Sequence, residues 1–198
     1  MNTNEVTTRL EQILGVLNDT IKAVVKENPS AARATMSVHG PLVVFVVKTD
    51  PEDARWVFGR GGKHFKALHL LLRRMLAREG MEADLHYDEK ETPHQPRQSQ
   101  QPFVPRAPKK FSTLEDLVRR IVTLCVEKKE EVDVKSTDLG SAAIFEIDVA
   151  NSDRHSVYGE QMTTEDGFAT GANIEAIKNI FDAVGKNFGC RVRIILTK

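Results

Sequence analysis

The sequence has few cysteines, no net charge and no long apolar run. Its 198 residues include two cysteines, Cys125 and Cys190, which provide neither a disulfide framework nor the spacing of metal ligands. No apolar run approaches the roughly 18 residues of a membrane span. The segment MNTNEVTTRL lacks the basic start and apolar stretch of a signal peptide. We therefore expect a cytoplasmic protein with no membrane association, no metal and no cofactor.

The charges balance, with 28 Lys and Arg against 28 Asp and Glu. Nucleic-acid-binding domains usually carry a basic excess, so this total gives no support for that class. Enzyme signatures are also missing, because the sequence has no zinc motif, no nucleophile elbow and no poised Cys/His set. We expect a protein that is not an enzyme, whose partner is indicated by where its charges lie.

Proline is concentrated in one segment. Five of the eight prolines lie in residues 92–110, TPHQPRQSQQPFVPRAPKK, which is also rich in Gln. This composition predicts an extended linker without a core of its own. Its charges are all basic, so it is either a solvated spacer or a strap that touches a phosphate backbone. We predict a domain at 1–88, a linker at 89–111 and a domain at 112–198.

The two halves read as repeats of one another. Each half has the pattern of an amphipathic helix, two strands, a short helix, a long helix and a final strand. In the first half these elements are expected at 8–26, 33–38, 42–48, 52–58, 62–78 and 83–87. In the second half the strands are expected at 132–136, 142–149 and 191–196. The predicted fold class is α+β, with two α-β-β-α-α-β domains, each a three-stranded sheet packed on helices.

Glycine and apolar positions keep a common register between the halves. The residues Gly40, Phe45, Asp53, Val57, Phe58 and Gly59 match Gly140, Phe145, Asp153, Val157, Tyr158 and Gly159, all 100 positions later. Gly62 matches Gly171, 109 positions later. Two residues separate Gly59 from Gly62, whereas eleven separate Gly159 from Gly171. The second half therefore carries nine inserted residues in the loop between its two later helices.

The segment Gly59-Arg60-Gly61-Gly62 is expected between the short and long helices of the first half. A glycine-rich turn allows close backbone approach, and the helix that follows adds positive partial charge at its N-terminus. Together they suit a phosphate group, with the amides of residues 61–63 as expected donors. Val57 and His64 exclude a Walker loop, because they replace its first Gly and its Ser or Thr. A dinucleotide fingerprint is excluded because the turn joins helix to helix.

This element order, with the glycine turn between paired helices, resembles a type II KH domain. The stretch DPEDARWVFGRGGKHFKALHLLLRRMLAREG is similar to the small stand-alone bacterial RNA-binding proteins of the KH domain-containing protein A family. The similarity covers about residues 8–88, and a weaker version extends to 112–198. The resemblance implies a GXXG loop that clamps single-stranded RNA by its backbone. Ribosomal and small regulatory RNAs are the candidate targets, and single-stranded DNA stays open as an alternative.

The charges around the turn have one sign. Residues 55–78 contain seven Lys and Arg and no acid. Those on the long helix fall within one arc, whereas solvated helix faces normally mix signs. The predicted nucleic-acid-binding residues are Arg55, Gly59, Arg60, Gly61, Gly62, Lys63, Lys66, Arg73 and Arg74. Trp56 is either a base-stacking or a packing residue, and His64 and His69 are expected on the polar surface.

The second half departs from this pattern. Residues 154–188 hold three Lys and Arg and five acids, and the inserted loop itself is acidic. Such a surface should repel a polyanion. We expect a degenerate KH-like domain that serves interaction or orientation, with residues 160–170 as a candidate protein-binding segment. Removal of residues 111–198 should then leave most RNA affinity intact. A protein-interaction scaffold with a KH-derived fold is the alternative.

Overall fold

The computed structural model describes residues 3–88, 111–163 and 169–197. The elements of the first half are α1 (Thr3–Val24), β1 (Arg33–His39), β2 (Leu42–Lys48), α2 (Pro51–Phe58), α3 (Lys63–Ala77) and β3 (Glu82–Tyr87). Those of the second half are α4 (Phe111–Cys125), β4 (Asp133–Asp138), β5 (Ala142–Asp148), α5 (Arg154–Tyr158), α6 (Ala172–Phe188) and β8 (Arg191–Leu196). The predicted α+β class is confirmed. The predicted linker lies almost wholly outside the described residues.

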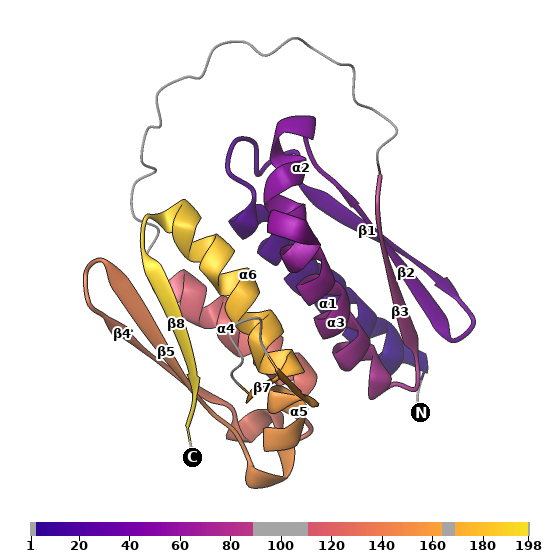
Figure 1. Ribbon diagram of the computed structural model, residues 1–198. Coiled ribbons are helices and arrows are strands. Elements are labelled where there is room, and N and C mark those ends of the chain that lie inside the picture. The colour runs from indigo at the N-terminus through magenta and orange to yellow at the C-terminus, as the bar shows by residue number, and fades with distance from the viewer. Residues whose placement is uncertain (1–2, 89–110, 164–168, 198) are drawn as a thin grey trace.

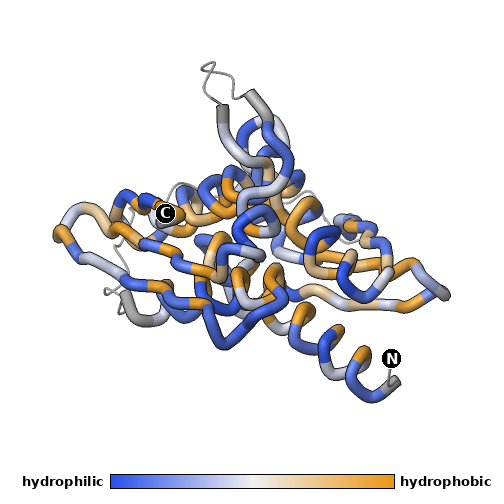
Figure 2. Tube along the Cα trace, turned by 90° about the horizontal axis from the view of Figure 1, so that it is seen from below, coloured by the Kyte–Doolittle hydropathy of each residue, from blue (hydrophilic) through white to orange (hydrophobic). Residues whose placement is uncertain are grey.

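The largest change of boundary is at the first helix, which begins at Thr3 rather than near Thr8. No Gly or Pro interrupts this stretch, and Val6 adds one more side chain to those that pack against the core. The inserted segment also differs from the expected loop. It forms a hairpin of two short strands, β6 (Gln161–Thr163) and β7 (Ala169–Gly171), which projects from the helices in Figure 2.

Each half contains a mixed three-stranded sheet with the same topology. The central strand β2 runs antiparallel to β1 and parallel to β3, and β5 has the same relation to β4 and β8. Phe45 and Phe145 occupy equivalent positions in the two central strands, and both are fully buried. Every second residue of β2 is buried, so the run LVVFVVK turns one face to the helices.

The two halves pack on each other through their helices. Figure 1 shows the two sheets on the outside and the helices α1, α3, α4 and α6 between them. Contacts join α3 to α6 most extensively, and α1 also touches α4 and α6. The buried apolar side chains form one continuous cluster that includes both halves. The regions predicted as separate domains therefore share a single core.

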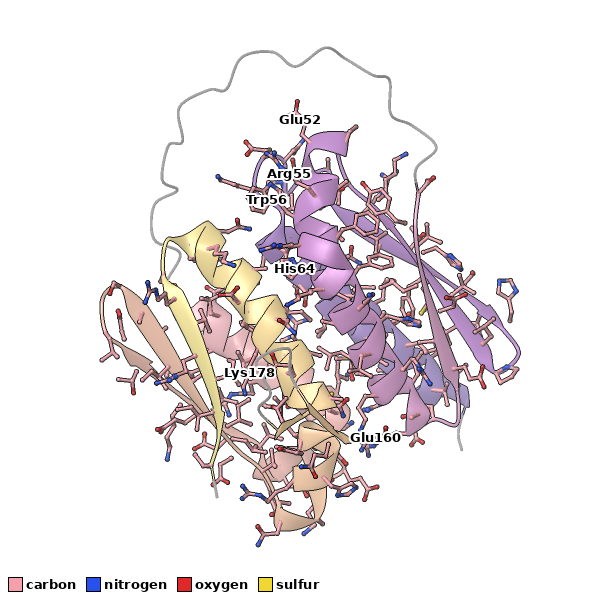
Figure 3. All side chains as sticks on the ribbon, viewed as in Figure 1. Glu52, Arg55, Trp56, His64, Glu160 and Lys178 are labelled. Carbon is pink, nitrogen blue, oxygen red and sulfur yellow. The ribbon has the colours of Figure 1, made fainter. Side chains whose placement is uncertain are left out.

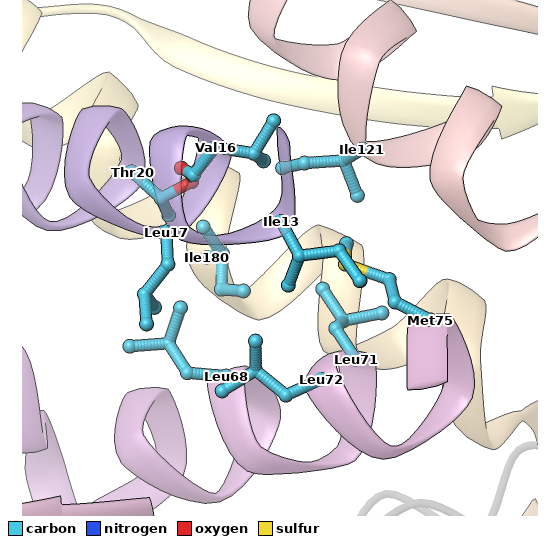
Figure 4. Close-up of a pocket in the computed structure, with 10 residues that line it drawn as sticks. All are labelled: Ile13, Val16, Leu17, Thr20, Leu68, Leu71, Leu72, Met75, Ile121 and Ile180. Carbon is cyan, nitrogen blue, oxygen red and sulfur yellow. Dashed lines mark hydrogen bonds between the residues drawn. The ribbon is translucent and has the colours of Figure 1, made fainter. Parts of the chain in front are cut away.

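Side chains from four helices meet at this interface, as Figure 4 shows. They surround a cavity of about 20 Å³. The lining residues are Ile13, Val16, Leu17, Thr20, Leu68, Leu71, Leu72, Met75, Ile121 and Ile180. A space of that size holds about one water molecule. Thr20 is the polar residue in this lining, and its hydroxyl donates to the carbonyl of Val16 at 2.7 Å. The other lining side chains are apolar. The cavity is a small packing defect rather than a ligand site.

The helix ends are joined reciprocally across the interface. The guanidinium of Arg78 donates to the carbonyl of Val126, just beyond α4. The amide of Asn187 donates to the carbonyl of Ala23 at 3.0 Å, near the end of α1. Arg78 and Asn187 are 109 positions apart, the offset that relates the second part of the repeat. Each half thus caps the first helix of the other, as in an approximately twofold-symmetric dimer.

A buried aspartate fixes the start of the short helix in each half. Asp53 accepts hydrogen bonds of 2.8–3.1 Å from the three backbone amides of residues 26–28. Asp153 accepts two, of 2.8 and 3.0 Å, from the amides of residues 127–128. Both side chains are almost wholly buried, at 0% and 2% exposed. Each carboxylate therefore holds the short helix against the end of the preceding long helix, which positions the turn that follows.

Across the described part of the chain, every helix is too short or too polar to cross a bilayer.

Candidate nucleic-acid interface

The glycine turn between α2 and α3 has a backbone shape that requires glycine. Gly59 ends α2 with φ 67° and ψ 175°, a combination available almost only to glycine. Gly61 and Gly62 are left-handed, with φ of 64° and 76°. The amide of Gly62 donates to the carbonyl of Gly59 at 3.1 Å, and the amide of Lys63 donates to the carbonyl of Arg60. These two amides, expected as phosphate donors, are therefore engaged within the turn.

The His64 side chain packs against the turn, next to Gly59. Its Nδ1 lies 2.8 Å from the carbonyl oxygen of Trp56, at hydrogen-bonding distance. A Cβ added at Gly59 would lie only 2.6 Å from the His64 ring, so Gly59 is also needed for this close approach. A Cβ at Gly61, by contrast, would meet nothing within 4 Å. The turn is thus closely packed at Gly59 and open at Gly61. The predicted surface role of His64 is wrong, because its ring is part of the turn.

The same correction applies to His69, which is half-buried on α3. Its Nε2 lies 3.1 Å from the carbonyl oxygen of Ala83 in β3. The ring therefore ties α3 to the edge strand of its own sheet rather than facing solvent. No local pattern predicts this role, because it depends on the approach of two elements that are distant along the chain.

The basic residues around the turn separate into two groups. Five are exposed and lie on α2, in the turn or on α3: Arg55, Arg60, Lys63, Lys66 and Arg73. Arg74 does not belong with them, because it is half-buried and its guanidinium donates to the Ser156 hydroxyl in the second half. The helical periodicity predicts that Arg73 and Arg74 share one arc of the helix. In the folded chain, the packing of the two halves buries part of Arg74 and leaves Arg73 exposed. The exposed set is the basic track, and Arg74 is an interface residue.

Aromatic side chains flank the turn on the side of the sheet. The Phe58 ring lies 5.0 Å, centroid to centroid, from Phe65 and from Tyr87. All three side chains are half-buried. Tyr87 belongs to β3, which is an edge strand of its sheet. This cluster was not predicted, although the apolar residues Phe58 and Phe65 beside the glycines are a local signal for part of it. Partly exposed aromatic rings next to a phosphate-type turn suit base stacking.

Trp56 packs against the core and also contacts two cations. It is half-buried, with the Arg55 guanidinium 5.1 Å and the Lys26 ammonium 5.4 Å from the ring centroid. Figure 3 shows Arg55 and Trp56 near His64, which lies in the first turn of α3. The ring therefore has a packing role and also holds a positive group at the edge of the basic track.

The corresponding turn of the second half is structurally related and chemically different. Gly159 has φ 81° and ψ −172°, close to the values of Gly59. Asn173 stands where the first half has His64, and its amide donates to the carbonyl of Ser156 at 2.7 Å. After Gly159 the chain enters the β6–β7 hairpin, so the turn does not lead directly into α6. The open position that Gly61 provides in the first half is replaced by the hairpin.

The charges of α6 are mixed and paired, with Asp182 and Lys186 exposed and Glu175 and Lys178 half-buried. Lys186 lies 2.6 Å from Asp182, and Lys178 lies 3.8 Å from Glu175. Glu160, at the start of the hairpin, is exposed beside the lower part of α3 in Figure 3. This is the usual solvated helix face, which differs from the one-signed track on α3. The candidate protein-binding segment 160–170 lies partly outside the described residues.

Neither the family models nor the curated proteins that were compared with this chain include a match. Among the described residues, no group of three or more His, Cys, Asp or Glu side chains is arranged to hold a metal ion.

Proposed function

We propose that this chain is a tandem pair of type II KH domains and that the first binds single-stranded RNA through the glycine turn and α3. The order of helices and strands in each half, and the mixed sheet with one parallel pair, support this assignment. A KH domain uses its GXXG loop to hold the backbone of a few nucleotides. The second half is proposed to be a degenerate copy.

One observation carries the proposal: an open glycine turn adjoins an exposed helix face with charges of a single sign. Arg60 and Lys63 are exposed at the turn, and Lys66 and Arg73 continue along α3. Space at Gly61 lets a phosphate approach the backbone closely. Bases from the same strand could stack on Phe58 and Phe65 while the phosphates follow the cations. This division of roles suits a single strand better than a duplex.

Replacing Arg60 and Gly61 together tests this proposal. Arg60→Asp/Gly61→Asp reverses one charge and adds another where the backbone is open, so affinity for a short single-stranded RNA should fall at least about tenfold. Asp tolerates a left-handed backbone better than most residues, so the fold should survive. Fluorescence anisotropy with labelled RNA measures the affinity, and a matched DNA competitor reports whether the strand must be RNA.

The second half offers a matched control. Lys135→Asp/Gly140→Asp makes the same change in charge, and Gly140 also has a positive φ, 76°, with open space around its Cβ direction. Lys135 is exposed and pairs only loosely with Asp133, at 3.5 Å. This variant should bind RNA like the wild type. Equal losses in both variants, or none in the Arg60/Gly61 variant, would show that the glycine turn is not the binding site.

The proposed role of the second half is to support the first. Its α6 packs on the apolar face of α3, and Ile180 of α6 lines the same small cavity as Leu71 and Leu72. Removal of residues 111–198 would expose that face to water. The earlier expectation that truncation leaves RNA affinity intact therefore no longer follows, and substitutions in the full chain are the appropriate test.

A further inference from the structure

A charged hollow lies at the far end of α3, away from the glycine turn. It has a volume of about 460 Å³, which is within the usual range of small-molecule sites. Three elements form it: the first turns of α1, the end of α3 and a short turn at Lys129–Glu131 of the second half. Arg78 is roughly 22 Å along the helix from Lys63, at 1.5 Å per residue. The hollow is therefore separate from the proposed RNA site.

Three cations converge on this hollow. Arg9 is only 7% exposed, Arg78 is half-buried and Lys129 reaches in from the second half. Two carboxylates also line it, Glu5 at the exposed rim and Glu79 inside. Positive groups therefore outnumber negative ones by three to two within one concave surface.

The buried carboxylate, Glu79, already has an ion-pair partner. Glu79 Oε1 lies 2.6 Å from Arg9 Nε, and both side chains are more than nine-tenths buried. Arg9 also donates through Nη2 to the carbonyl of Leu124 at 2.7 Å. Glu79 thus pairs directly with Arg9 and offsets the charge of Lys129 only in part. Arg78 interacts electrostatically with Asp153, which lies outside the lining of the hollow.

Burial and the mutual repulsion of these cations lower the pKa values of Lys129 and Arg9. Partial burial, followed by repulsion from Arg9 and Arg78, lowers the pKa of Lys129, and Glu79 opposes this only in part. Burial, followed by repulsion from Arg78, likewise lowers the pKa of Arg9. An anion that enters between like charges held together in this way reduces their repulsion and so stabilises the folded protein.

The rim supplies neutral polar groups as well. Asn4, Thr8 and Gln12 recur every four residues and so share one face of α1 that lines the hollow. The N-terminus of this 22-residue helix adds positive partial charge at its first turn. Side-chain amides and hydroxyls next to cations are the usual partners of phosphate oxygens.

We propose that this hollow, between Arg78 and Lys129, binds a small phosphate-bearing molecule with at least two negative charges, such as a pyrophosphate or the phosphates of a nucleotide. The molecule would bridge the two halves, because Arg78 belongs to the first and Lys129 to the second. Binding should therefore stabilise the folded chain.

Inorganic pyrophosphate is the first probe, with the full chain and with ionic strength matched by sodium chloride. Calorimetry should detect binding, and the melting temperature should rise with pyrophosphate concentration. Lys129→Gln should weaken binding about 10- to 100-fold, as expected for loss of one charge-assisted contact. Without pyrophosphate this variant should be at least as stable as the wild type, because repulsion from Arg9 and Arg78 is removed.

The neighbouring lysine is the matched control. Lys128 is exposed, pairs with Glu131 at 3.0 Å and does not line the hollow, so Lys128→Gln should bind pyrophosphate like the wild type. A nucleoside triphosphate should bind as pyrophosphate does, whereas the nucleoside without phosphates should not. Absence of pyrophosphate binding by the wild type, or equal binding by Lys129→Gln, would overturn the proposal.

The Arg60→Asp/Gly61→Asp variant separates this site from the proposed RNA site. It should bind pyrophosphate normally, whatever its RNA affinity. Loss of pyrophosphate binding in that variant would place the anion at the glycine turn and would contradict the assignment to the hollow.

Discussion

At the scale of single residues, the glycine turn depends on two different kinds of glycine. Gly59 has a backbone conformation that other residues almost never adopt, and it lies against the His64 ring. Gly61 has an ordinary left-handed conformation with open space around it. The first therefore maintains the fold of the turn, and the second leaves room for a ligand.

Two alanine substitutions should distinguish these roles. Gly59→Ala should lower the free energy of unfolding by about 2–4 kcal/mol, because it adds a steric overlap to backbone strain. Gly61→Ala should cost about 1–2 kcal/mol, from the left-handed conformation alone. Urea unfolding followed by circular dichroism measures both. Equal costs would mean that the His64 contact does not constrain Gly59.

The buried Asp153 makes a second prediction at this scale. Burial acts to raise its pKa, but hydrogen bonds from the amides of Lys128 and Glu127, with Arg78 and His155 nearby, lower the pKa overall below its ordinary 3.8. A carboxylate with a depressed folded-state pKa stabilises the fold above its unfolded pKa, and this contribution is lost as pH falls through the folded value.

Asp153→Asn should therefore be less stable than the wild type at pH 5–7, and the difference should shrink below about pH 4. Unfolding curves of both proteins across this range give the comparison. A difference in stability that is the same at pH 3 as at pH 7 would contradict the role of the ionised carboxylate.

At the scale of elements, α3 has two sides with different roles. One side carries the exposed basic track, and the other packs against α6. Arg73 and Arg74 are neighbours in sequence that fall on different sides of this division. Arg73 is exposed, whereas Arg74 contacts Ser156 across the interface.

These neighbours should respond differently to the same substitution. Arg73→Gln should weaken RNA binding about threefold to tenfold and leave stability unchanged, because one phosphate contact is lost. Arg74→Gln should lower the free energy of unfolding by about 1–2 kcal/mol and leave RNA affinity nearly unchanged. Anisotropy and urea unfolding of both variants test this. The reverse pattern would place Arg74 in the RNA track.

Elements were more predictable from the sequence than their contacts. The strand patterns around Phe45 and Phe145 and the glycine at position 59 are local signals, so the order of elements could be predicted. The aromatic cluster of Phe58, Phe65 and Tyr87 joins three elements, and no local pattern links Tyr87 to the turn. The hairpin was expected as a loop because its strands are only three residues each.

At the scale of the whole molecule, the chain resembles a dimer made within one polypeptide. Helices α3 and α6 pack on each other, and Arg78 and Asn187 cap the first helices of opposite halves. The sequence repeat predicted two similar units. It could not predict that they share a core, because an amphipathic stripe does not specify what covers it.

Cutting the chain between the two halves should leave them together. A protease site introduced between residues 96 and 102 would allow cleavage of the folded chain. Because the apolar faces of α3 and α6 remain buried against each other, both fragments should elute as one complex on gel filtration. Fragments that separate without unfolding would show that each half is stable alone and that the shared core contributes little.

Crosslinking would show whether single-stranded RNA contacts the first half at its glycine turn, as proposed. A short RNA crosslinked by ultraviolet light to the full chain, followed by mass spectrometry of the peptides, should place the attachment points within residues 55–73, with Phe58 and Phe65 as the expected stacking partners. Attachment confined to residues 111–198, or none in a complex that demonstrably forms, would show that the glycine turn is not where the RNA binds.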